Sequence, residues 1–202
     1  MPRSFEEFQK LKYENPDWDK YKSEFRAINA DANQFEDYKR ILGDSRLPKS
    51  IDKFRDLKYN GFGDYKLLER DYTNEVRAVA FRNRISGDDI NLAVRRQKQQ
   101  DHILGSSEWH RRVRQSAEIG APLEGAFYRD VDVQKLITDN AGKGLIKFRG
   151  NDYYPREYFN TDGIVGIAYD NKAKRYIKSN RVAIHYGAKG THAYPVIDLQ
   201  GR

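Results

Sequence analysis

With 202 residues, the chain can form one large domain or two small ones, and an aromatic content of 13% argues against disorder throughout. The absence of cysteine excludes disulfides, thiolate nucleophiles and metal sites built on thiolates. No apolar run is long enough to span a membrane, and no apolar segment of a signal peptide follows the start, so we expect no membrane partner.

The positive charge is concentrated in the second half of the chain. Residues 1–95 hold 19 Lys and Arg against 18 Asp and Glu, a net charge of +1, whereas residues 96–202 hold 18 against 12, a net charge of +6. The four histidines also lie in this half: His102, His110, His185 and His192. This asymmetry predicts a polyanionic partner for the second half alone.

The first half is predicted to be helical. Ser4 with Glu7 three residues later is a capping box, and the helix that it begins is expected to end before Pro16. The spacing of apolar residues predicts two further helical stretches, one carrying Trp18, Tyr21 and Phe25 and one from Gln34 to Leu42 that ends on Gly43.

This pattern is repeated. Residues 4–13 are echoed by residues 50–59, and with one extra residue allowed the later helical stretch also has a counterpart. The corresponding side chains are Trp18, Tyr21 and Phe25 in one copy and Tyr65, Leu68 and Tyr72 in the other. We interpret the repeat as two helical hairpins that form a packing or docking module, because its charges balance and it contains no histidine.

The composition changes near residues 86–89, and we predict a helical docking region over residues 1–94 and a basic α+β domain over residues 95–202. In the second domain, two helices are expected to pack on one face of a small antiparallel meander. The predicted helices are Ser106–Glu118 and Val131–Asn140, the latter capped by Asp130; the predicted strands are Leu145–Phe148, Ile164–Tyr169, Arg175–Lys178, Arg181–Tyr186 and Thr191–Ile197.

The last two predicted strands form a hairpin around residues 187–190. With a four-residue loop, His185 faces His192 across the ladder, and both lie on the open face of the sheet. Arg181 and Tyr194 share that face, and Lys189 lies in the loop. A slip of one residue would instead send the two imidazoles to opposite faces.

Two imidazoles ringed by cations suit cleavage of a phosphodiester without a metal or cofactor. One histidine removes the proton of the 2′-hydroxyl while the other protonates the leaving oxygen, and cations stabilise the charge on phosphate. We predict His185 and His192 as acid and base, with His102 as a further catalytic candidate. The predicted contacts to nucleic acid are Arg96, Lys98, Lys178, Arg181, Lys189 and Tyr194.

Other readings of the same residues remain open. A histidine on a strand is often structural, and a histidine pair can also supply part of a metal site, although no third ligand is evident nearby. Residues 95–105 can equally be a solvated linker, and His110 is read as a surface residue. The segment Gly142-Lys143-Gly144 is read as a turn.

Several segments of the second half resemble the polymorphic toxin type 50 domain. The resemblance covers the chain from Arg95 onward. The motifs are Arg96-Gln97, His102-Ile103 with Gly105, Val131-Asp132-Val133-Gln134 with Leu136, Ala141-Gly142 with Gly144, Ile164 with Gly166, Ile184-His185-Tyr186, Lys189-Gly190, His192 and Pro195. The resemblance implies a ribonuclease with the fold of barnase, EndoU, colicin E5 and RelE, a domain that closes contact-dependent inhibition toxins and some phage minor head proteins.

The helical repeat resembles segments of minor capsid proteins from phages of Gram-positive bacteria. That resemblance implies phage head and portal proteins as partners and a location in the virion and in the bacterial host cytoplasm. The toxin resemblance leaves open whether an immunity protein is a further partner. Two hypotheses follow. One is a phage-associated ribonuclease toxin that cleaves RNA; the other is a non-enzymatic minor capsid protein that binds nucleic acid, RNA or DNA, through phosphate contacts alone.

Overall fold

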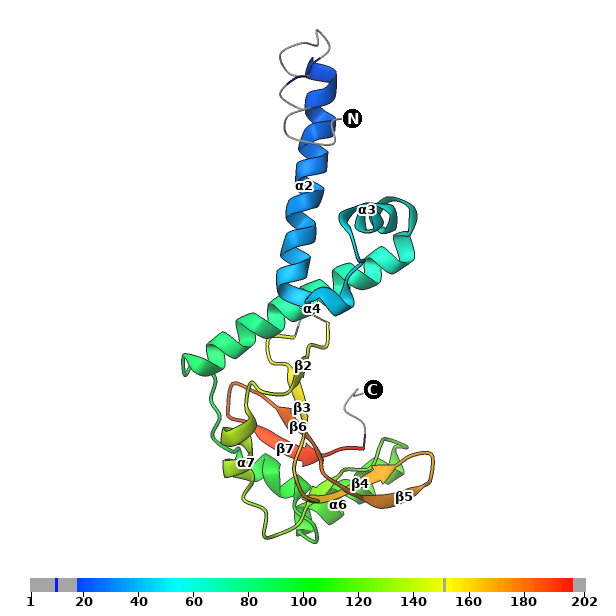
Figure 1. Ribbon diagram of the computed structural model, residues 1–202. Coiled ribbons are helices and arrows are strands. Elements are labelled where there is room, and N and C mark those ends of the chain that lie inside the picture. The colour runs from blue at the N-terminus through cyan, green and yellow to red at the C-terminus, as the bar shows by residue number, and fades with distance from the viewer. Residues whose placement is uncertain (1–9, 11–17, 151, 198–202) are drawn as a thin grey trace. The chain divides into compact units, whose positions relative to one another are not determined.

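The computed structural model describes Lys10, residues 18–150 and residues 152–197 (Figure 1). The chain divides into two compact units, residues 1–76 and residues 77–202. The predicted domain boundary between residues 94 and 95 rested on a change of composition, and it stays a prediction. Within the described part of the chain, no helix is long and apolar enough to cross a membrane.

The first unit is built from helices. They are α2 (Trp18–Leu42), the short 3₁₀ helix η1 (Asp44–Arg46), α3 (Ile51–Asn60) and the beginning of α4 (Phe62–Ser86). The two stretches predicted around Trp18 and Gln34 are therefore one continuous helix, since no proline or glycine separates them. The predicted end is confirmed: Gly43 has a φ of 75°, a conformation that favours glycine, and its N–H donates to the carbonyl of Lys39 at 2.9 Å.

The core of the first unit is aromatic. Phe54 of α3 is fully buried, and its ring centroid lies 5.4 Å from that of Phe35 and 5.6 Å from that of Tyr38 in α2. Tyr65 of α4 contacts the same ring at 6.0 Å. The apolar face of the second hairpin thus packs against the C-terminal end of α2. The first copy of the repeat lies outside the described residues, apart from Lys10, so the pairing of the two copies stays a prediction.

The second unit confirms the α+β class. After α4 its helical elements are α5 (Arg96–Gln99), the 3₁₀ helix η2 (Gln100–His102), α6 (Ser107–Glu118) and α7 (Val133–Asn140). Its strands are β1 (Ala126–Phe127), β2 (Leu145–Lys147), β3 (Arg156–Asn160), β4 (Gly166–Asp170), β5 (Arg175–Ser179), β6 (Arg181–His185) and β7 (His192–Pro195). The start predicted for α7 was wrong, because Asp132, and not Asp130, accepts a hydrogen bond from the N–H of Lys135.

The strands form two antiparallel sheets instead of one meander. One sheet has the order β1-β4-β5 and the other the order β2-β3-β6-β7. Strand β3, which the sequence analysis missed, pairs along its whole length with β6. The hairpin of β4 and β5 is therefore excluded from the four-stranded sheet and forms a separate sheet with β1.

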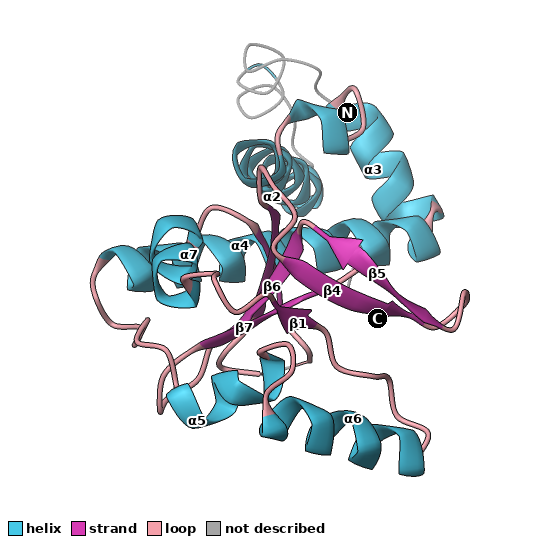
Figure 2. Cartoon of the chain, turned by 90° about the horizontal axis from the view of Figure 1, so that it is seen from below, coloured by secondary structure: helices cyan, strands magenta, loops and turns pink. Residues whose placement is uncertain are grey.

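One face of the four-stranded sheet forms the core of the second unit. Val182 and Ile184 of β6 are fully buried there against helices α4 and α7, from which Phe81 and Ile137 enter the same cluster. Figure 2 shows α7 on one side of β6 and β7, and α5 with α6 on the other side, so the prediction that both helices pack on one face of the sheet was wrong. Because side chains alternate along a strand, His185 projects from the face turned toward α5 and η2.

Candidate functional site

The β6–β7 hairpin brings two histidines together as predicted. His185 and His192 are directly opposed in the ladder, and their ring centroids lie 4.9 Å apart. The loop of residues 187–190 is closed by a hydrogen bond from the N–H of Gly190 to the carbonyl of Gly187. Gly190 has a φ of 110°, and a Cβ atom there would lie 2.7 Å from the carbonyl oxygen of Ala93, so a larger residue would disturb this loop.

His102 joins the pair from a distant part of the chain. Its ring, at the end of η2, is stacked on His192 with centroids 5.5 Å apart and on Tyr194 with centroids 4.9 Å apart. Its Nδ1 lies 3.1 Å from the carbonyl oxygen of Gly125. Because a carbonyl can only accept, Nδ1 carries the proton and Nε2 of the neutral ring keeps the lone pair. We call His102, His185, His192 and Tyr194 the histidine cluster.

The segment before η2 is held along the outer edge of β7. Val94 forms a parallel bridge with Thr191, and the side chain of Gln99 both donates to the carbonyl and accepts from the N–H of Ala193, each at 3.0 Å. The Gln99 amide thus satisfies backbone groups that an edge strand would otherwise leave unpaired. This anchoring places the next turn, with His102, over the histidine pair.

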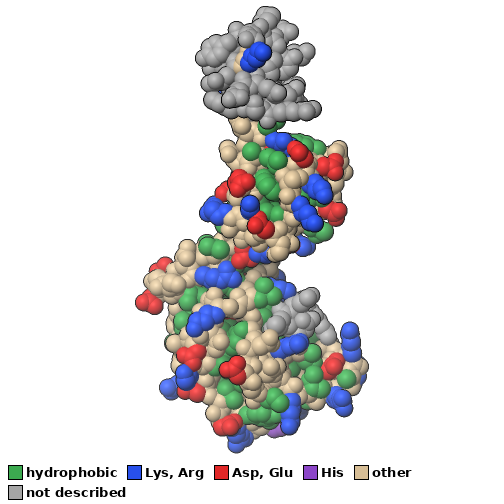
Figure 3. Space-filling model, in the orientation of Figure 1, with side chains coloured by type: hydrophobic (Ala, Val, Ile, Leu, Met, Phe, Trp, Pro, Cys, Tyr) green, Lys and Arg blue, Asp and Glu red, His purple; other side chains and the backbone are tan. Residues whose placement is uncertain are grey.

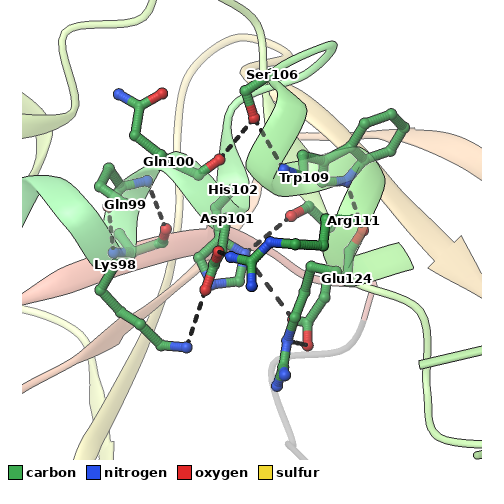
Figure 4. A network of polar contacts seen from close by, with 12 residues as sticks. Lys98, Gln99, Gln100, Asp101, His102, Ser106, Trp109, Arg111 and Glu124 are labelled. Atoms are coloured by element: carbon green, nitrogen blue, oxygen red, sulfur yellow. Dashed lines mark hydrogen bonds and ion pairs between the residues drawn. The ribbon is translucent and has the colours of Figure 1, made fainter. Parts of the chain in front are cut away.

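Carboxylates surround His102, and each is held by a cation (Figure 4). Asp101 is buried and lies 3.0 Å from Nζ of Lys98 and 3.7 Å from the guanidinium of Arg111. Glu124 accepts a hydrogen bond from Arg112 at 3.1 Å, and its other oxygen is 3.9 Å from Nδ1 of His102. Among the residues that the structure describes, no group of three or more His, Asp and Glu side chains is arranged to hold a metal ion.

Burial and neighbouring positive charges disfavour the protonated form of all three histidines. Burial, followed by the charges of His102 and His185, lowers the pKa of His192 from 6.5 to about 3. Burial and then the charge of Arg156 lower the pKa of His185. Burial also lowers the pKa of His102, although the charge of Glu124 opposes this effect. At neutral pH the free site therefore holds three neutral imidazoles.

This electrostatic arrangement predicts a loss of stability in mild acid. Below pH 6.5 the unfolded chain protonates His192 while the folded site does not, so stability should fall as the pH drops from 6.5 toward 3, by about 1.4 kcal/mol per pH unit for this residue. His185 and His102 act in the same direction. Urea denaturation at pH 7 and pH 5 should differ by about 2 kcal/mol or more.

The matched comparison for this prediction is His192→Asn against His110→Asn. His110 is exposed on α6, outside the histidine cluster. His192→Asn should flatten the profile between pH 7 and pH 5, and His110→Asn should leave it as in the wild type. If the two variants gave the same profile, burial of a neutral His192 would not be the cause.

The predicted nucleic-acid contacts are only partly brought together. Tyr194 belongs to the histidine cluster, and Lys98 acts electrostatically on all three of its histidines. Arg181 is exposed on the same face of β6 as His185, and its guanidinium donates to the carbonyl of Ile197 at 2.6 Å. The hairpin loop exposes Lys189.

Two of the predicted contacts stand apart. Arg96 is exposed at the start of α5. Lys178 is exposed on β5 and pairs with Ile167 of β4. It therefore belongs to the three-stranded sheet, whereas the histidine pair lies on the four-stranded sheet. On the face of the second unit visible in Figure 3, Lys and Arg side chains are scattered without forming one patch, and little histidine surface is seen.

Arg156 was not among the predicted site residues. It stands on β3 directly opposite His185, and its charge lowers the pKa of both His185 and His192. The sequence gives one indication of this strand. Side chains alternate along a strand, so Arg156, Tyr158 and Asn160 would share one face of a strand that begins after Pro155.

Residues 94–195, which contain all three clustered histidines, match a family of bacterial toxins, so the C-terminal half is a polymorphic toxin domain. That family is bacterial toxin 50, and the chain belongs to it. No match to a curated protein was found.

Proposed function

We propose that residues 94–195 act as a metal-independent endoribonuclease that cleaves RNA through His185 and His192. The observation that supports this best is the pairing of these two imidazoles, 4.9 Å apart, on a sheet surface that also carries Arg156. Both rings are partly accessible. Such a pair can remove and deliver protons around one phosphodiester.

His192 is the proposed general base. Burial, followed by the charges of its neighbours, lowers its pKa to about 3, so its ring is neutral at pH 7 and has a lone pair that can accept the proton of the 2′-hydroxyl. His185 is the proposed general acid: burial and then the charge of Arg156 lower its pKa in the free site, and among its neighbours Asp152 acts in the opposite direction and favours the protonated form. The 2′-oxygen then attacks phosphorus, the bond to the 5′-oxygen breaks, and His185 protonates that leaving oxygen. The products are a 2′,3′-cyclic phosphate and a free 5′-hydroxyl.

His102 acts by positioning. Its side chain is 4% exposed, and its ring is stacked on His192 and fixed by the carbonyl of Gly125. It therefore holds the plane of His192 without reaching the substrate. His102 was among the predicted catalytic candidates, and the burial of its ring favours this supporting role.

The remaining predictions belong to the same proposal. The helical first unit would dock on phage head or portal proteins, which would place the protein in the virion and then in the bacterial host cytoplasm. An immunity protein would protect the producing cell. The basic surface of the second unit would bind RNA in preference to DNA, because only RNA has the 2′-hydroxyl that this chemistry uses.

The experiment is incubation of the full-length protein with transfer RNA and with plasmid DNA in the presence of EDTA. We expect RNA fragments that end in cyclic phosphate and an intact plasmid. Intact RNA that is retarded in a gel, with an affinity that falls steeply with salt, would reject the enzyme and favour the non-enzymatic binding protein.

A further inference from the structure

A row of basic side chains crosses the four-stranded sheet at the histidine cluster. Lys147 of β2 is opposed to Arg156 of β3, Arg156 to His185 of β6, and His185 to His192 of β7. Directly opposed residues have Cβ atoms about 4.5–5.5 Å apart and lie on one face of the sheet. The row therefore places two cations beside two imidazoles.

Like charges directly opposite each other destabilise a sheet, so such a row needs a compensating anion. Two other half-buried cations near the cluster have one: Lys98 is 3.0 Å from Asp101, and Arg112 is 3.1 Å from Glu124. Within the part of the chain that the structure describes, no carboxylate lies within ion-pair distance of Arg156. Its side chain is half-buried, which makes the unpaired charge costly.

The charge of Arg156 reaches both members of the histidine pair. It lowers the pKa of His185 and of His192, whereas the charge of Asp152 acts on His185 in the opposite direction. Lys98 also acts on both rings, but Asp101 partly neutralises it. Arg156 is thus the strongest candidate for an anion at the pair, and a guanidinium offers two parallel donors to the oxygens of a phosphate.

We propose that Arg156, together with His185 and His192, forms a phosphate-binding site in which the guanidinium holds the phosphate group that the histidines act on. The phosphate site rests on the proposed function in one respect only, which is that the bound phosphate is the scissile group of RNA. Binding brings a negative charge beside two histidines that Arg156 and burial keep neutral. The charge raises their affinity for protons, which supplies the general acid with its proton when substrate is present.

The test uses inorganic phosphate and the full-length protein. Binding is measured by calorimetry at pH 6.5 with ionic strength matched by chloride, and the histidine Cε1–H signals are followed by NMR. In the wild type, phosphate should raise the pKa of His185 by roughly one unit or more. Arg156→Gln should weaken phosphate binding about tenfold or more and, without phosphate, should itself raise the pKa of His185.

Two further variants separate charge from geometry and from general damage. Arg156→Lys keeps the positive charge, so the pKa of His185 without phosphate should stay close to the wild-type value while phosphate binds less tightly. Arg175→Gln removes an exposed arginine that also begins a strand, but in the other sheet, and it should change neither measurement.

The outcomes are distinct. Wild-type protein that fails to bind phosphate, or Arg156→Gln protein that binds it as well as the wild type, overturns the phosphate site whatever happens to RNA. Phosphate binding that depends on Arg156 supports the site even if the wild type leaves RNA intact. That combination would reject the proposed ribonuclease and not the assignment of Arg156.

Discussion

Replacing His185 and His192 together with alanine should abolish cleavage of RNA in EDTA, with a loss of at least about a thousandfold in rate. Each histidine carries one of the two proton transfers, and general acid–base catalysis typically contributes a factor of about 10² to 10⁴ per group. Because the two act on one reaction, we expect the double variant to lose little more than the worse single variant. Single-turnover cleavage of a labelled RNA measures this.

His110→Ala is the matched control for the double variant. It removes the fourth histidine, which is exposed on α6, and should leave the rate within about twofold of the wild type, since it touches no part of the histidine cluster. Circular dichroism and the urea midpoint at pH 7.5 should show that all three proteins fold. Cleavage by the double variant at the wild-type rate would reject both histidines as acid and base.

The histidine pair could be predicted because it depends only on local rules. A strand has a period of two, and a short glycine-rich loop between two β-branched runs fixes the register of a hairpin. These rules require no knowledge of the rest of the chain. The opposition of His185 and His192 is the result, and the structure confirms it.

The position of His102 over that pair could not be predicted in the same way. It depends on the bonding of Gln99 to Ala193, two residues 94 positions apart in the sequence, and on the parallel bridge of Val94 with Thr191. Neither contact leaves a periodic signal. A glutamine side chain that completes a sheet edge looks like any exposed polar residue until the edge is known.

Strand β3 was missed for a related reason. Its inward face carries Glu157 next to Phe159, so the alternation of apolar and polar residues that identifies a half-buried strand is broken. Because this strand was not predicted, Arg156 was not recognised as a site residue, and one meander was expected where the structure has two sheets. A charged residue that points inward for a structural reason is thus the main cause of the error in topology.

Glu157 has no exposed surface, and its carboxyl group is the acceptor for three donors. One oxygen accepts from the N–H of Gly142 at 2.9 Å and from the hydroxyl of Tyr186, and the other accepts from the N–H of Gly144. A Cβ atom on Gly144 would lie 2.5 Å from the carbonyl oxygen of Tyr158. The glycines of this turn thus let the backbone approach the carboxyl group of β3 and tie the end of α7 to the sheet.

Glu157→Ala should therefore lower the free energy of unfolding by roughly 4 kcal/mol, because two backbone N–H groups and a phenol would be left without partners and a cavity would open beside them. Urea denaturation at pH 7.5 measures the change. Tyr186→Phe, which removes one of the three donors, should cost about 1–2 kcal/mol. Glu118→Ala, at an exposed position of α6, should stay within about 0.5 kcal/mol of the wild type. If Glu157→Ala lowered the free energy of unfolding no more than Glu118→Ala does, the turn would not depend on the carboxyl group of Glu157. The hydrogen bonds of that group would then not explain why a charged residue lies on the inward face of β3.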